Sequence, residues 1–235
     1  MTSTNNMDTG GKFKIRRLKR YLPRILWGLL GLLAVIFLLR IIIWEANYYH
    51  DQEGSERASS NIIANDNVDE TEVTEDDLSK YTVAPDRPRF LIIDKLGIKA
   101  RVIEVGINNE GELATPRSIF DVGWYGLSAK PGQAGTMLMD GHNGGPTKVG
   151  VFKYTPSLKE GDIITVERGD GAIFKYSVTD NVTIPLADAD AYMETAQQSP
   201  VEGAQSLTLI TCTGEWSQPQ QTYLSRQFTR AVLTE

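Results

Sequence analysis

The chain has 235 residues, of which 41% are hydrophobic and 23% are charged, as in an ordinary globular protein. Its formal net charge of −6 is not the basic balance that a nucleic-acid-binding protein usually carries. One cysteine excludes an intramolecular disulfide, and two histidines exclude a multi-histidine metal centre. We therefore expect no nucleic-acid partner, no metal and no other cofactor.

The first 44 residues have the pattern of a membrane anchor. Residues 1–24 end in a basic tail that holds seven Lys or Arg residues, and residues 25–44 are apolar apart from Arg40. A helix of 20 residues spans about 30 Å of hydrocarbon. Positive charges stay on the cytoplasmic side, so the rest of the chain is expected outside the cell. No small-residue cleavage pattern follows the span, which favours an uncleaved signal anchor over a cleaved signal peptide.

The next segment, residues 45–84, is expected to be an acidic flexible linker. Ten Asp or Glu residues and two basic residues lie between positions 51 and 80. A segment with so few large apolar residues cannot bury enough surface to offset the entropy of ordering it. We predict an extended tether that holds residues 85–235, a single domain, away from the membrane.

The pattern from residue 85 onward predicts an all-β domain with short helices. Alternating apolar residues and Gly, Pro or Asn/Asp punctuation are typical of short strands joined by turns. The hairpin 162–178 is expected to turn at residues 169–171, and a helix is expected at 186–196. The other expected strands are 89–98, 100–107, 134–142, 206–212 and 222–233. So many short strands favour a closed or nearly closed barrel.

Two residues with reactive side chains stand at expected strand ends. Cys212 ends an apolar strand and precedes a Thr-Gly loop signal, whereas His142 is flanked by glycines that leave its ring uncrowded. A thiol nucleophile and an imidazole that titrates near neutral pH suit nucleophilic catalysis. Taken singly, a buried structural cysteine and a surface-loop histidine are the alternatives.

The last expected strand supplies a third candidate. Arg226 and Arg230 alternate with apolar residues on one of its faces, which is unusual for a core face. An arginine there could stabilise a negatively charged oxygen in a reaction, or both arginines could lie on a solvated face. The spacing alone does not separate the two.

The motifs around these residues together resemble those of the sortase family. TLITCTG (208–214) resembles the sequence around the sortase nucleophile, DGHN (140–143) resembles the histidine motif, and Arg226 falls where the family's arginine is expected. The run 122–143 is similar to class F sortases and to some of classes E and D. The resemblance covers about residues 86–234, and the layout of tail, anchor, linker and C-terminal domain also fits.

The resemblance implies an eight-stranded β-barrel and a cysteine transpeptidase. Cys212 would attack an LPxTG-like sorting signal and form a thioacyl enzyme, His142 would transfer protons, and Arg226 would stabilise the oxyanion. Thr211 would contact the substrate, and residues 185–205 would form one wall of its groove. The acceptor would be an amine of lipid II or a peptidoglycan cross-bridge, or a pilin lysine.

Two features weigh against a pilin-polymerising sortase. The Asp-Pro-aromatic lid motif and a second apolar span near the C-terminus are both absent from the sequence. A cysteine peptidase or hydrolase on the same fold, and a non-catalytic peptide-binding domain, remain alternatives. The papain-like order, with cysteine before histidine, is the reverse of the order found here.

Overall fold

The computed structural model describes residue 40 and residues 68–108, 111 and 113–234. The predicted tail, and the predicted anchor apart from Arg40, lie outside these residues, as does the first part of the predicted linker. Within the described residues, no helix has the length and hydropathy that crossing a membrane requires.

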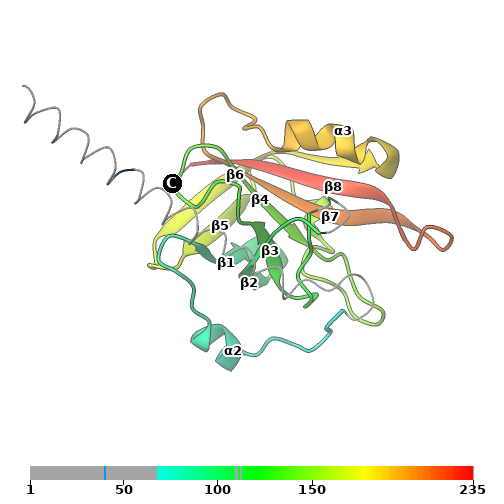
Figure 1. Ribbon diagram of the computed structural model, residues 1–235, viewed down its shortest axis with the longest axis horizontal. Helices are drawn as coiled ribbons and strands as arrows, with labels where there is room; N and C mark the ends of the chain where they lie inside the picture. Colours follow the sequence, from blue (N-terminus) through cyan, green and yellow to red (C-terminus); the bar gives the residue numbers. More distant parts are fainter. Residues whose placement is uncertain (1–39, 41–67, 109–110, 112, 235) are drawn as a thin grey trace, which may run out of the picture. The chain divides into compact units, whose positions relative to one another are not determined.

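Eight strands form a closed barrel (Figure 1), as the resemblance implied. The order around the barrel is β1-β2-β3-β4-β7-β8-β6-β5, and β1 pairs with β5 to close it. All neighbours are antiparallel except β2 with β3 and β4 with β7. The strands are β1 Pro88–Ile93, β2 Ile98–Val105, β3 Val122–Tyr125, β4 Thr136–Gly141, β5 Ile163–Arg168, β6 Ile173–Pro185, β7 Ser206–Ser217 and β8 Thr222–Leu233.

Side-chain alternation places the strands' apolar residues in a main core inside the barrel, and those of β6, β7 and β8 also in a second cluster on its outer face. Met137 and Met139 of β4, and Leu207 and Leu209 of β7, point into the barrel and are at most 1% exposed. Trp124 of β3 lies with them in this main core. Successive side chains point to opposite faces of a strand, so the intervening residues, including Cys212, lie on the outer face.

Helix α3, Leu186–Ala196, covers part of this outer face, at the residues predicted to be helical. It packs on β8 and β6 (Figure 1). Its Ala196 joins Ile210 and Phe228 in a second cluster, and the rings of Tyr192 and Phe228 lie 4.8 Å apart. The helix therefore has its own apolar contact with the outside of the barrel.

Strand β7 continues beyond the predicted end at Cys212, so that expectation was wrong. The strand runs to Ser217, and its register with β8 shifts between Thr213 and Trp216. Gly214 has φ +84 there, a conformation that glycine adopts without steric cost. The Thr-Gly pair read as a loop is thus a bulge inside a long hairpin.

Other differences from the predicted elements are smaller. Strand β3 was not predicted, and β6 extends to Pro185, beyond the predicted hairpin arm. Two short 3-10 helices, η1 Asp94–Leu96 and η2 Thr155–Ser157, lie between strands.

The end of the predicted linker also holds a helix, α2 Glu75–Lys80. The side chains and backbones of Thr74 and Asp77 form a reciprocal capping box, which satisfies donors that the first turn leaves unpaired.

Candidate active site

Cys212 and Arg226 lie directly opposite each other on neighbouring strands. Cys212 of β7 pairs with Arg226 of the antiparallel strand β8, so their Cα atoms are about 4.5–5.5 Å apart. Both residues are half-buried on the outer face of the barrel. Thr208 is the residue that pairs with Arg230, so Arg230 lies four residues, or about 13 Å, farther along the strand.

His142 directly follows the last residue of β4, Gly141. Strand β4 runs parallel to β7, and its last paired residues are Asp140 and Ile210, which lie two residues before His142 and Cys212. The side chain of the next residue joins this part of the chain to β7: Asn143 Nδ2 donates to the carbonyl oxygen of Cys212 at 2.7 Å. Cys212 and Arg226 are therefore neighbours across the strands, and the residue after His142 contacts the backbone of Cys212.

The His142 ring contacts the backbone at Pro116. Its Nε2 lies 2.7 Å from the carbonyl oxygen of Pro116. A carbonyl can only accept, so Nε2 carries the proton, and Nδ1 of the neutral ring has the lone pair. Burial lowers the pKa of His142, although the Pro116 carbonyl partly opposes this by stabilising the charged ring. At neutral pH the ring is uncharged and can accept a proton at Nδ1.

The Arg226 guanidinium contacts the base of the β7–β8 hairpin. Its Nη1 donates to the carbonyl oxygens of Tyr223 at 3.0 Å and Ser225 at 3.2 Å. Its Nη2 donates to Thr222 Oγ1 at 3.3 Å. Within the part of the chain that the structure describes, these neutral acceptors do not offset the positive charge of the group, which suits a partner that carries or develops negative charge.

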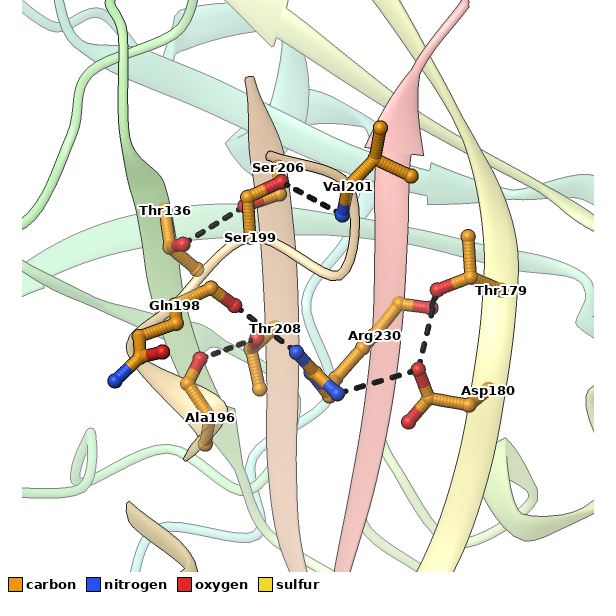
Figure 2. A network of polar contacts seen from close by, with 10 residues as sticks. All are labelled: Thr136, Thr179, Asp180, Ala196, Gln198, Ser199, Val201, Ser206, Thr208 and Arg230. Carbon is orange, nitrogen blue, oxygen red and sulfur yellow. Dashed lines mark hydrogen bonds and ion pairs between the residues drawn. The ribbon is translucent and has the colours of Figure 1, made fainter. Parts of the chain in front are cut away.

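Arg230 takes part in a different network, shown in Figure 2. Its Nη1 lies 3.5 Å from Asp180 Oδ2, and its Nη2 donates to the carbonyl oxygen of Gln198 at 3.1 Å. Thr208 of β7 donates to the Ala196 carbonyl beside it. These contacts connect the end of α3 and the segment after it to β8, β6 and β7, so Arg230 has a bracing role in the fold.

Thr211 is on the opposite face of β7 from Cys212. It is 4% exposed, and its hydroxyl donates to the carbonyl oxygen of Gly141 at 2.7 Å. The residue thus contacts the backbone immediately before His142. Its expected contact with substrate stays a prediction.

Sequence reasoning missed two residues that hold the site together. Asn143 follows His142 directly and lay within the quoted DGHN motif, so adjacency was an available signal. Pro116 lies 26 residues before His142, and no local pattern indicated that its carbonyl would bind the ring. In the part of the chain that is described, no group of three or more His, Cys, Asp or Glu residues comes together to hold a metal ion.

The arrangement offers three groups for acyl transfer. A thiol can attack a carbonyl carbon, a neutral imidazole can take and return a proton, and a guanidinium can stabilise the resulting oxyanion. These are the groups that a thioester-forming enzyme needs.

Comparison with known proteins agrees with this chemistry. The family model described as "Sortase domain" matches residues 91–234, which is more than half of the chain. No curated protein sequence matches this chain.

Solved structures similar to this chain include three sortases. Sortase C1 from Streptococcus agalactiae is 18% identical, with 82% of this chain and 90% of that chain covered and a TM-score of 0.48. Sortase E1 from Streptomyces coelicolor, solved with a tripeptide in its active site, is 22% identical, with coverages of 65% and 91% and a TM-score of 0.46. A Clostridium perfringens sortase D5 transpeptidase is 19% identical, with coverages of 79% and 98% and a TM-score of 0.44.

Proposed function

The chain belongs to the sortase family of cysteine transpeptidases, and from that premise we propose that it joins proteins bearing an LPxTG-like sorting signal to an amine of the cell wall. The observation that carries the proposal is the pairing of Cys212 with Arg226 in the β7–β8 register, with Asn143, the residue after His142, hydrogen-bonded to the Cys212 carbonyl oxygen. The acceptor amine would belong to lipid II or a peptidoglycan cross-bridge.

The first half-reaction forms a thioester. Cys212 Sγ attacks the carbonyl carbon of the signal's threonine, and its proton passes to His142 Nδ1. Arg226 stabilises the negative charge on the carbonyl oxygen. When the tetrahedral intermediate collapses, the bond to the following residue breaks and His142 returns the proton to the leaving amine. The lowered pKa of His142 supports this order, because the ring is neutral before it acts as a base.

The second half-reaction reverses these roles with a new amine. The acceptor attacks the thioester carbonyl, His142 takes its proton, and Cys212 leaves and is reprotonated. Thr211 supports the site through Gly141, since its buried hydroxyl contacts that carbonyl rather than open surface. The segment 185–205, which includes α3, forms one wall of the substrate groove.

Sortase domains act outside the cell and in association with the membrane. For this chain we propose a cytoplasmic segment 1–24, a single-pass anchor at 25–44 and an extracellular catalytic domain. The charge asymmetry around residues 25–44 supports this orientation.

The test is to incubate the protein with a library of LPxTG-like peptides and a panel of amines, and to read the products by mass spectrometry. We expect a new amide between the threonine and an amine, and a thioacyl adduct on Cys212. Cleavage without a new amide would favour a hydrolase, and no product with any peptide would count against the proposal.

The control for this experiment is Cys212→Ala. Cys212 is half-buried and outside both apolar clusters, so removing its sulfur should change the Tm little while abolishing the adduct and all products. A variant that unfolds would instead identify Cys212 as a packing residue.

A further inference from the structure

Asp140 is a buried carboxyl that the proposed reaction does not use. It lies on the outer face of β4, two residues before His142, which follows the last residue of the strand. Its Oδ2 accepts a hydrogen bond from Thr115 Oγ1 at 2.7 Å. Its Oδ1 is buried and has no hydrogen-bond partner among the described residues. A buried oxygen without a partner is costly, so the position of this carboxyl needs an explanation.

A glycine on the neighbouring strand makes room for this carboxyl. Gly123 of β3 pairs directly with Asp140. A Cβ atom at position 123 would lie 2.5 Å from Asp140 Oδ1 and 2.9 Å from Pro116 Cδ, closer than real Cβ contacts. The carboxyl therefore occupies a slot between the backbone of β3 and the segment that contains Thr115 and Pro116.

The same short segment binds the imidazole. Asp140 holds the hydroxyl of Thr115, and the carbonyl of the next residue, Pro116, accepts from His142 Nε2 at 2.7 Å. Asp140 on β4 and His142 just beyond the end of the strand thus contact two successive residues, Thr115 and Pro116. The fixed φ of proline limits how the Pro116 carbonyl can turn once its neighbour is held.

We propose that Asp140 is a positioning residue for transpeptidation: it fixes Thr115 and Pro116, and through the Pro116 carbonyl it fixes the orientation and tautomer of His142. The inference rests on the proposed role of His142 in proton transfer. Asp140 itself touches none of the reacting groups.

The protonation state of Asp140 is consistent with such a role. Burial raises the pKa of Asp140 to about 8, and only the Thr115 hydroxyl opposes the rise. The carboxyl is therefore mainly a neutral acid at pH 7. No charged group of the described residues contributes to this pKa. A negative charge near the imidazole would raise the pKa of His142. A neutral acid can hold Thr115 and Pro116 without introducing such a charge.

The first readout is the imidazole itself, measured by nitrogen-15 NMR of the full-length chain in detergent micelles. Only His50 and His142 contribute signals, so assignment needs one His50 variant. We expect the Nε2–H tautomer for His142 in the wild type and in Asp140→Asn at pH 7. Thr115→Val, which removes the donated bond, should give mixed tautomers. An unchanged His142 signal in Thr115→Val would overturn the proposal, whatever its activity.

The second readout is the rate of thioester formation with a peptide that the wild type cleaves. Because small misplacement of a catalytic group is costly, Thr115→Val should lower kcat by about 10- to 100-fold with little change in KM. Asp140→Asn should match the wild type at pH 7 and retain activity above pH 8, where ionisation of Asp140 should slow the wild type.

A matched control separates positioning from a general loss of packing. Thr229→Val removes the hydroxyl of a fully buried threonine, which donates to Asn181 Oδ1 and lies three residues along β8 from Arg226. Equal kcat losses in Thr115→Val and Thr229→Val would also overturn the proposal. If the tautomer shifts as expected but the wild type forms no thioester with any peptide, the proposed function fails while the positioning role stands.

Discussion

At the scale of single residues, the strand register distinguishes two arginines that the sequence pattern left equal. Both point to the outer face of β8, but Arg226 lies opposite Cys212 and Arg230 lies opposite Thr208. Among the described residues, the guanidinium of Arg226 contacts neutral acceptors, whereas Arg230 pairs with Asp180. We therefore expect removal of Arg226 to affect activity and removal of Arg230 to affect stability.

Arg226→Ala should lower kcat/KM by about 100- to 1000-fold, the loss typical when a group that stabilises an oxyanion is removed. Its Tm should change little. Arg230→Ala should instead lower the Tm, because it leaves Asp180 and the Gln198 carbonyl without their partner. Peptide cleavage and thermal unfolding measured side by side check both statements. Equal, mild losses of activity would remove the assignment of Arg226.

At the scale of elements, the bulge in β7 sets the direction of the hairpin that begins beside Cys212. Gly214 has φ +84, and a Cβ there would also lie 3.2 Å from Ser225 Oγ. Ser225 is one of the two residues whose carbonyls hold Arg226 Nη1. The shape of the hairpin and the position of the guanidinium are thus connected.

Gly214→Ala should destabilise the protein by about 1–2 kcal/mol, because a residue with a Cβ is strained at positive φ. It should also lower kcat by displacing Ser225, whose carbonyl oxygen accepts from Arg226 Nη1. Gly171→Ala is the matched control, since Gly171 has φ +86 in the β5–β6 turn and open space around it. The control should share the stability loss and keep its activity. A control that lost as much activity would disprove the link between bulge and site.

A second element, the segment just before α2, braces loops that flank His142. The Asp69 backbone exchanges hydrogen bonds with Arg117 and Ile119, next to Pro116. The Glu70 carboxylate accepts from the backbone amides of Thr147 and Lys148, at 2.8 and 2.9 Å. The end of the predicted linker is therefore part of the folded domain.

Glu70→Gln should loosen the 144–148 loop, because the Thr147 hydroxyl donates to the second carboxylate oxygen, Oε2, and the amide nitrogen that replaces this oxygen cannot accept. Hydrogen exchange of the Thr147 and Lys148 amides should become faster. Glu72→Gln is the control, because the contact of Glu72 within the described residues is with the Lys148 ammonium, in an exposed pair that contributes little. Equal exchange rates in the two variants would show that Glu70 does not order the loop.

At the scale of the whole molecule, two buried groups make stability depend on pH in opposite directions. His142 has a lowered pKa, so the unfolded state takes up a proton first and stability falls as the pH drops below about 6.5. Asp140 has a pKa raised from 3.8 to about 8. Its folded form binds more protons than the unfolded chain in that interval, so its contribution to stability falls as the pH rises.

Asp140→Asn isolates the second effect, because an amide does not titrate. Relative to the wild type, the variant's Tm should rise by several degrees between pH 5 and pH 9, at roughly 2–4 °C per kcal/mol for a domain of this size. Calorimetry at pH 5, 7 and 9 provides the measurement. A difference in Tm that stays constant with pH would mean that Asp140 does not carry its proton in the folded state.

The sequence by itself determined the parts of this protein that depend on local pattern. Alternation of apolar residues predicted most strands, and helix 186–196 was predicted to the residue. The DGHN and TLITCTG motifs identified His142 and Cys212 as candidates. These signals are local because strand alternation, helix formation and motif chemistry depend on residues that are close together in the sequence.

The tertiary structure alone decided which groups meet. The β7–β8 register puts Arg226 rather than Arg230 opposite Cys212, and the 26-residue separation of Pro116 from His142 hid a contact that no local pattern encodes. The bulge at Gly214 turned a loop signal into a strand. Strand pairing and burial join residues that are far apart in the sequence, and these contacts form only when the barrel closes. A short stretch of sequence therefore does not predict them.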